Sequence, residues 1–377
     1  ANRRLLLVLD DVRDAAQVRP MLPGATGRSS VIVTSRRAMP TVGSDHIGVG
    51  ILDNADAIEL LARVVGSDRV AAEPEAAADI VDLCGRLALA VRIAAARLVA
   101  RTDWTLSTMA TRLADERHRL DELESDDLTV RSSCAISVDT LDDDAAHLFQ
   151  YLGVLDLATI SPHAAAALVR RTVPAAERLL DALVDVHLAD PSGGPRRVLH
   201  DLVRLYARDL AHERLSADER HAAIVRVGHH YVLAARTACR VYGPVPRRRM
   251  EAGVASSDLS GAAPAIPDGV ALRHWVRHEA ANVSAVTWHL ASLGSIGSPL
   301  LVALGSAVVE PFGSLGLWSD AMTVNETALA AAEETGDAAA DQHRRPVDGQ
   351  RPEAVDDALL QVTTDARRHD ERREDDG

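Results

Sequence analysis

Two adjacent aspartates near the amino end of the sequence have the residue type and spacing that phosphate chemistry needs. Asp10 and Asp11 directly follow the unbroken aliphatic run of residues 5–9, a pattern typical of a strand buried on both faces of a parallel sheet. At the carboxyl end of such a strand, one carboxylate can hold Mg²⁺ and a second can polarise the attacking water. We therefore predict Asp10 and Asp11 as catalytic residues and Asp10 as the metal ligand. The alternative is an ordinary turn in which both acids cap the strand end.

Three further segments follow the acid pair in order along the chain. They are Val31-Ile32-Val33-Thr34-Ser35-Arg36, Leu83-Cys84-Gly85-Arg86-Leu87-Ala88-Leu89-Ala90 and Val198-Leu199-His200-Asp201-Leu202-Val203-Arg204-Leu205-Tyr206-Ala207. Together with the acid pair, the series resembles the Walker B strand, the sensor strand, the Gly-x-Pro segment and the Met-His-Asp segment of NB-ARC (STAND-type) signal-transduction ATPases. Residues 17–24, 70–75 and 113–117 look most like the AfsR/SARP transcriptional regulators of that group. The resemblance covers roughly residues 4–337.

This resemblance implies ADP or ATP with Mg²⁺ as the cofactor, and it implies roles for four more residues. Arg36 would read the γ-phosphate, because a guanidinium can fork onto two oxygens. Leu87 and Ala88 would lie against the adenine, although Ala88 stands where the family has proline. His200 would contact the β-phosphate of ADP. The alternatives are a surface salt bridge for Arg36, a plain core helix at Leu87 and Ala88, and a neighbour of a helix cap for His200.

The elements that must position these residues are mainly helices. Aromatic residues make up only 3% of the chain and hydrophobic residues 47%, so the cores must be built from small aliphatic side chains on helices. Strands are predicted at residues 5–9 and 31–34, and a weak third one at 47–51. One long helix is predicted over residues 74–98. Three short helices at 143–152, 162–170 and 174–186, followed by a hairpin at 188–198, indicate a winged helix.

The expected fold is mostly α with a small α/β part, comprising an incomplete P-loop NTPase parallel sheet, a helical domain, a winged helix and TPR-like helices. By resemblance, the carboxy-terminal part of an NB-ARC nucleotide-binding domain spans residues 1–53. The expected units after it are a helical domain (54–135), a winged-helix domain (136–215), a helical linker region (216–293), the start of TPR-like helices (294–337) and a disordered tail (338–377).

Charge and composition narrow the possible functions. The net charge is −14 and the sequence contains no lysine, so we expect no DNA binding by this fragment. A phosphate loop of the form Gly-x-x-x-x-Gly-Lys-Ser/Thr does not occur in the sequence, and with it the usual cradle for the phosphates is missing. The three scattered cysteines are interpreted as reduced thiols. We expect a cytoplasmic chain without a membrane span.

We therefore predict a truncated, nucleotide-switched transcriptional regulator that is unable to hydrolyse ATP alone, with protein partners at its carboxy-terminal helices and possible self-association. The main alternative is a non-enzymatic helical scaffold for protein–protein interaction. A third possibility is a competent NTPase whose phosphate loop comes from another chain.

Overall fold

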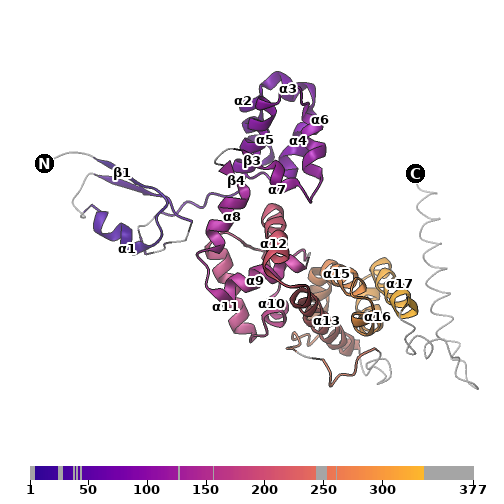
Figure 1. Cartoon of the computed structure of the whole chain (residues 1–377). Helices are drawn as coiled ribbons and strands as arrows, with labels where there is room; N and C mark the ends of the chain where they lie inside the picture. The colour runs from indigo at the N-terminus through magenta and orange to yellow at the C-terminus, as the bar shows by residue number, and fades with distance from the viewer. Residues whose placement is uncertain are drawn as a thin grey trace, which may run out of the picture.

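The computed structural model describes residues 5–334 apart from 24–28, 37–38, 40, 43–44, 126–127, 156, 243–252 and 260. Over these residues the protein is mostly helical with a small share of strands, as the composition predicts. Figure 1 shows the pair of strands to one side of three successive groups of helices. Within the described residues, no helix is long and apolar enough to span a bilayer.

The amino-terminal unit consists of β1 (Leu6–Leu9), α1 (Ala15–Val18), the 3-10 turn η1 (Arg19–Met21) and β2 (Ser30–Val33). The two strands pair in parallel, with Leu6 opposite Ser30 and Leu9 opposite Val33, as strands joined by a crossover connection do. Both predicted strands are thus present. Two strands cover little of their own aliphatic surface, and Leu6 and Ile32 remain 63% and 51% exposed.

The next group contains six helices, drawn at the top of Figure 1. They are α2 (Asn54–Val65), α3 (Ser67–Ala72), α4 (Pro74–Leu83), α5 (Ala88–Ala100), α6 (Leu106–Ala114) and α7 (Arg119–Glu122). The prediction of one long helix over residues 74–98 is wrong. Gly85 and Arg86 have φ values of +58° and +57°, in the left-handed region that ends a helix. The chain leaves α4 there and re-enters a helix at Ala88.

The central group begins with the short antiparallel pair β3 (Glu124–Ser125) and β4 (Leu128–Thr129). It continues through α8 (Val130–Val138), α9 (Asp143–Val154), α10 (Pro162–Val169) and α11 (Val173–Asp185) to the hairpin β5 (Asp190–Pro191) and β6 (Arg197–Val198), and then α12 (Asp201–Arg214). The three short helices and the hairpin lie where the sequence predicts them. Helices α9 and α12 cross closely, since a Cβ built on Gly153 would lie 2.0 Å from the Ala207 carbonyl oxygen.

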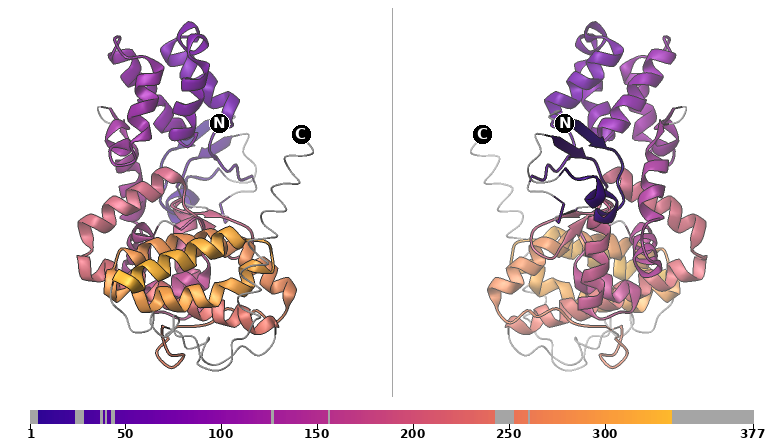
Figure 2. Two further views of the ribbon diagram at one scale, coloured as in Figure 1. Left: turned by 90° about the vertical axis from the view of Figure 1, so that its right-hand side faces the viewer. Right: turned by 90° about the vertical axis from the view of Figure 1, so that its left-hand side faces the viewer.

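The last group consists of α13 (Ala217–Cys239), the 3-10 turn η2 (Arg240–Tyr242), α15 (Gly269–Ala291), the 3-10 turn η3 (Gly294–Ile296), α16 (Ser298–Gly313) and α17 (Trp318–Glu334). In both views of Figure 2 these helices lie at the opposite end of the molecule from α2–α6. A capping box between Ser216 and Glu219 starts α13, which satisfies two amides at the helix end.

A buried polar cluster ties the hairpin to the last group. The Arg196 guanidinium, next to β6, lies 2.6 Å from Glu279 on α15. The Glu279 carboxylate also accepts hydrogen bonds of 2.8 Å from the Tyr231 hydroxyl and the Asn282 amide. All four residues are buried. A buried polar group that loses its partner cannot turn to water instead, so the cluster fixes the hairpin against α13 and α15.

Two other predictions concern a third strand and the carboxy-terminal tail. The weak third strand predicted at residues 47–51 is wrong, because these residues form no β-ladder. Ile47 and Val49 are 89% and 94% exposed. The predicted disordered tail at 338–377 lies outside the described residues.

Candidate functional site

The predicted acidic pair lies at the carboxyl end of β1, beside the end of β2. The Thr34 hydroxyl donates a short hydrogen bond to Asp10 and accepts one of 2.9 Å from the Asp11 amide. The Val12 amide donates to the Thr34 carbonyl oxygen, also at 2.9 Å. Asp11 has a φ of +50°, a backbone conformation that aspartate tolerates better than most residues. Thr34 therefore fixes the place of both acids.

Arg36 joins the same group from the end of β2. Its Nε lies 3.4 Å from Asp11 Oδ1, and the two side chains are 41% and 71% exposed. Its Nη1 donates to the Ser133 carbonyl oxygen of α8 at 3.3 Å. The guanidinium thus lies between the strand end and the central helices. An exposed pair of this kind contributes little to stability, so its charges remain able to rearrange around an anion.

The acids fit a Mg²⁺ ion that is also held by phosphate. Mg²⁺ is usually bound through one or two carboxylates together with waters and substrate phosphates, and Asp10 and Asp11 are both exposed at the strand end. Among the described residues, no group of three or more His, Cys, Asp or Glu side chains is arranged around a common metal position. Phosphate and water would therefore have to supply the remaining ligands.

His200 lies at the amino end of α12 and contacts the turn between α4 and α5. Its Nε2 is 2.7 Å from the carbonyl oxygen of Gly85, and its Nδ1 accepts a hydrogen bond of 3.3 Å from the Leu202 amide. A carbonyl oxygen can only accept, so Nε2 carries the hydrogen and Nδ1 is the acceptor. The side chain therefore caps α12 and at the same time contacts the turn between α4 and α5.

Leu87 and Ala88 lie directly after this turn. Leu87 is the residue before the first turn of α5, in an extended conformation, and Ala88 is the first residue of the helix. Leu87 is half-buried and Ala88 exposed. The Arg86 carbonyl oxygen accepts a hydrogen bond of 3.0 Å from the Leu52 amide, which links the turn to the segment that follows the strands.

The contacts thus join the predicted residues in two groups. Asp10, Asp11 and Arg36 meet at the strand ends, while His200 meets the turn that precedes Leu87 and Ala88. Sequence reasoning missed Thr34 and Gly85 as positioning residues. A hydroxyl at the end of the second strand was the available signal for Thr34, whereas the partner of Gly85 lies 115 positions away along the chain.

Cysteine chemistry is disfavoured in both groups. Burial raises the pKa of the Cys84 thiol, next to Gly85, to about 12. Burial likewise raises the pKa of the Cys134 thiol to about 11, although the Arg36 charge acts in the opposite direction. Both thiols are therefore protonated near neutral pH, and a protonated thiol is a poor nucleophile.

Comparison with known proteins finds similarity to two bacterial regulatory proteins. No protein-family model matches it. It is 36% identical to the regulatory protein AfsR of Streptomyces griseus over 365 residues, which are 95% of the chain and 37% of that relative. It is 37% identical to the regulatory protein AfsR of Streptomyces coelicolor over 290 residues, which are 75% of the chain and 29% of that relative. The chain is homologous to AfsR regulatory proteins. The matched residues span 37% and 29% of the length of these two relatives.

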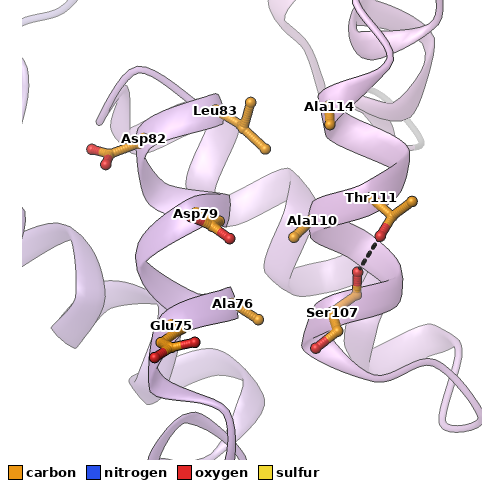
Figure 3. Close-up of a pocket in the computed structure, with 9 residues that line it drawn as sticks. All are labelled: Glu75, Ala76, Asp79, Asp82, Leu83, Ser107, Ala110, Thr111 and Ala114. Carbon is orange, nitrogen blue, oxygen red and sulfur yellow. Dashed lines mark hydrogen bonds between the residues drawn. The ribbon is translucent and has the colours of Figure 1, made fainter.

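A groove in the α2–α7 group is lined by none of the six predicted site residues. It has a volume of about 540 Å³ and lies between α4 and α6. Glu75, Asp79 and Asp82 of α4 line the groove together with Ser107 and Thr111 of α6, and Figure 3 shows that the Asp82 carboxylate points away from α6. The Thr111 hydroxyl donates to the Ser107 carbonyl oxygen at 2.9 Å. Three carboxylates along one wall repel phosphate, so this groove does not suit a nucleotide.

Proposed function

We propose that the chain is part of a nucleotide-switched transcriptional regulator of the AfsR/SARP type, in which ADP and ATP with Mg²⁺ are the alternative ligands. One observation carries the proposal. Asp10, Asp11 and Arg36 meet at the carboxyl ends of two parallel strands, the edge at which open α/β sheets bind their ligands. The homology to AfsR regulatory proteins supports the regulatory role.

In this proposal each part of the fold has a place in the switch. The β1–β2 pair is part of a P-loop NTPase sheet, whose exposed aliphatic side chains would be covered by further strands. Helices α9–α11 with the β5–β6 hairpin form a winged helix, and α16 and α17 begin a TPR-like array. Asp10 would hold Mg²⁺, Asp11 would polarise water, and Arg36 and His200 would contact phosphates.

Hydrolysis by these 377 residues alone is not expected in this proposal. A phosphate loop does not occur in the sequence, and the amides, lysine and hydroxyl of that loop normally hold the triphosphate. We therefore expect weak nucleotide binding through the two groups and no turnover. A phosphate loop supplied from outside these residues would be needed for catalysis.

Calorimetric titration with ADP and with ATP–Mg²⁺ tests the proposal. We expect binding in the micromolar range, and about tenfold weaker binding for Arg36→Gln, because a charged contact to phosphate contributes about 1.4 kcal/mol or more. Arg63→Gln is the matched control, since Arg63 pairs with Glu59 on the exposed surface of α2. The absence of a heat change at millimolar nucleotide would count against a nucleotide switch. An equal loss of nucleotide affinity in Arg36→Gln and Arg63→Gln would also count against it.

An interaction scaffold is the second candidate, and one feature favours it. Met322 and Leu329 on α17 are 51% and 50% exposed and lie seven positions apart, so they share one face of the helix. An apolar face of this kind suits a further helix. A chain that binds no nucleotide yet self-associates, with the association lost in Met322→Gln, would support the scaffold over the switch.

A further inference from the structure

The hydrogen bond between His200 and Gly85 joins two parts of the fold that are far apart in sequence. His200 is the cap residue before α12, and Gly85 belongs to the turn between α4 and α5. Both ring nitrogens of His200 are engaged by backbone groups, Nε2 by the Gly85 carbonyl oxygen and Nδ1 by the Leu202 amide. These partners fix the ring as the neutral Nε2–H tautomer. The imidazole therefore has a single N–H, and Gly85 accepts it.

We propose that Gly85 is the positioning residue of His200, and that their hydrogen bond is a latch that holds the amino end of α12 on the α4–α5 turn. The latch is built only from the protein's own groups, so the docked arrangement is intrinsic to the chain. It extends the role of His200 beyond a helix cap, because the capping nitrogen is Nδ1 and the latching nitrogen is Nε2.

The shape of the turn supports this assignment. A Cβ built on Gly85 would lie 2.0 Å from Cε1 and 2.3 Å from Nε2 of His200, distances that real atoms do not adopt. The φ of Gly85 is also in the left-handed region, at +58°, where glycine has no steric penalty. Only a residue without a side chain lets the ring approach the carbonyl. The turn and the histidine therefore fit each other as a pair.

Other polar contacts along α12 are charged and exposed. Arg208 lies 3.1 Å from Glu116, and Asp209 lies 2.6 Å from Arg131, which also pairs with Asp121. The side chains in these pairs are 33–57% exposed. Such pairs are weak and are screened by salt. The neutral latch is not screened, so among these polar contacts it should weaken least at high ionic strength.

The latch also bears on ligand binding, and this step rests on the proposed function. A phosphate oxygen that takes the Nε2–H of His200 must first displace the Gly85 carbonyl oxygen. The Gly85 carbonyl oxygen and the phosphate would then compete for the single N–H of His200. The experiment below uses no nucleotide, so the latch stands or falls separately from the nucleotide switch.

Two substitutions at His200 separate the cap from the latch. His200→Asn keeps an acceptor close to the backbone and caps α12 well, but it is too short to reach Gly85. His200→Gln places its amide N–H₂ near the position of Nε2 and can restore the latch, but it is a poor cap. Hydrogen exchange is measured at about 1 M salt, where the screening length is about 3 Å, on the Leu52 amide and on the first turn of α12.

We expect opposite effects of the two variants. In His200→Asn the Leu52 amide should exchange about fivefold to tenfold faster, as the loss of one hydrogen bond predicts, while the first turn of α12 stays protected. In His200→Gln the Leu52 amide should return towards the parent rate and the first turn of α12 should exchange faster. Unchanged Leu52 exchange in His200→Asn would show that His200 is only a cap and would overturn the proposal.

The tautomer gives a second measurement, which is made on the parent chain. Imidazole ¹⁵N shifts of the parent chain, with the His200 signals assigned by their loss in His200→Asn, should report a protonated Nε2 and an unprotonated Nδ1. A ring that carries its only hydrogen on Nδ1 can neither accept from the Leu202 amide nor donate to the Gly85 carbonyl oxygen. That result would also overturn the latch.

Discussion

The buried ion pair between Arg196 and Glu279 offers the sharpest test of how the hairpin is held. We predict that Arg196→Met weakens the docking of the hairpin on α13 and α15 by about 3 kcal/mol, at the lower end of the 3–5 kcal/mol for a buried charge that loses its partner. The lower end applies because Glu279 keeps its hydrogen bonds from Tyr231 and Asn282. Both members of the pair are less than 10% exposed, so water cannot readily replace the guanidinium.

A second substitution should restore most of this loss. In Arg196→Met with Glu279→Gln the buried charge is gone, and the glutamine oxygen can still accept from Tyr231 and Asn282. Replacement of a whole buried ion pair by neutral groups is often close to neutral in stability. The double variant should therefore be more stable than Arg196→Met alone, although it carries one more change.

The assay is hydrogen exchange of the α15 amides followed by mass spectrometry, because it reports local opening in a chain of several units. A loss of about 3 kcal/mol speeds exchange about 100-fold. Arg171→Met is the matched control, since the Arg171–Asp144 pair has side chains 52% and 53% exposed, and such pairs contribute about 0–1 kcal/mol. Equal rates in Arg196→Met and Arg171→Met would refute the claim that burial makes the first pair important.

Two further predictions concern buried positions. Burial lowers the pKa of His230 from 6.5 to about 4. Between these pH values the unfolded chain binds a proton at His230 that the folded chain does not bind, so the free energy of unfolding falls by up to about 3 kcal/mol as the pH drops from about 6.5 to 4. A denaturation series over this range should show a smaller fall in His230→Phe than in the parent. Gly153→Ala should destabilise the α9–α12 crossing by about 1–3 kcal/mol, because the added Cβ meets the Ala207 carbonyl oxygen and overpacking forces the helices apart. Thermal melting checks this, with Gly48→Ala, where nothing lies within 4 Å, as a control that should melt like the parent.

Local pattern was sufficient to predict most elements of the fold. Strands β1 and β2 and helices α9–α11 lie close to their predicted bounds, because aliphatic runs, caps and helical periodicity are local signals. The long helix over 74–98 was wrong because Leu83 and Leu87 continue the apolar period across Gly85. The strand at 47–51 was wrong because a strand needs a hydrogen-bonding partner, and alternation of Ile47 and Val49 does not provide one.

The site was predictable only where topology is simple. Parallel strands end at the same edge of a sheet, so the approach of Arg36 to Asp11 follows once the two strands are recognised. The approach of His200 to Gly85 follows from no local pattern. It depends on how α12 packs against the preceding helices, and the acceptor is a backbone carbonyl that any residue possesses. The missing side chain of Gly85 was the only sign of it in the sequence.

The two groups of candidate residues differ in the physical nature of their contacts, and this difference suits them to different tasks. The Asp11–Arg36 pair is charged and exposed, so its geometry is weakly held and responds to any anion or cation that approaches. The His200–Gly85 contact is neutral, half-buried and fixed in tautomer, so salt hardly affects it and only a competing acceptor opens it. In the proposed switch, the strand ends would respond to the charge of a ligand and the His200–Gly85 contact would hold α12 in place, which are the two components that a ligand-operated switch requires.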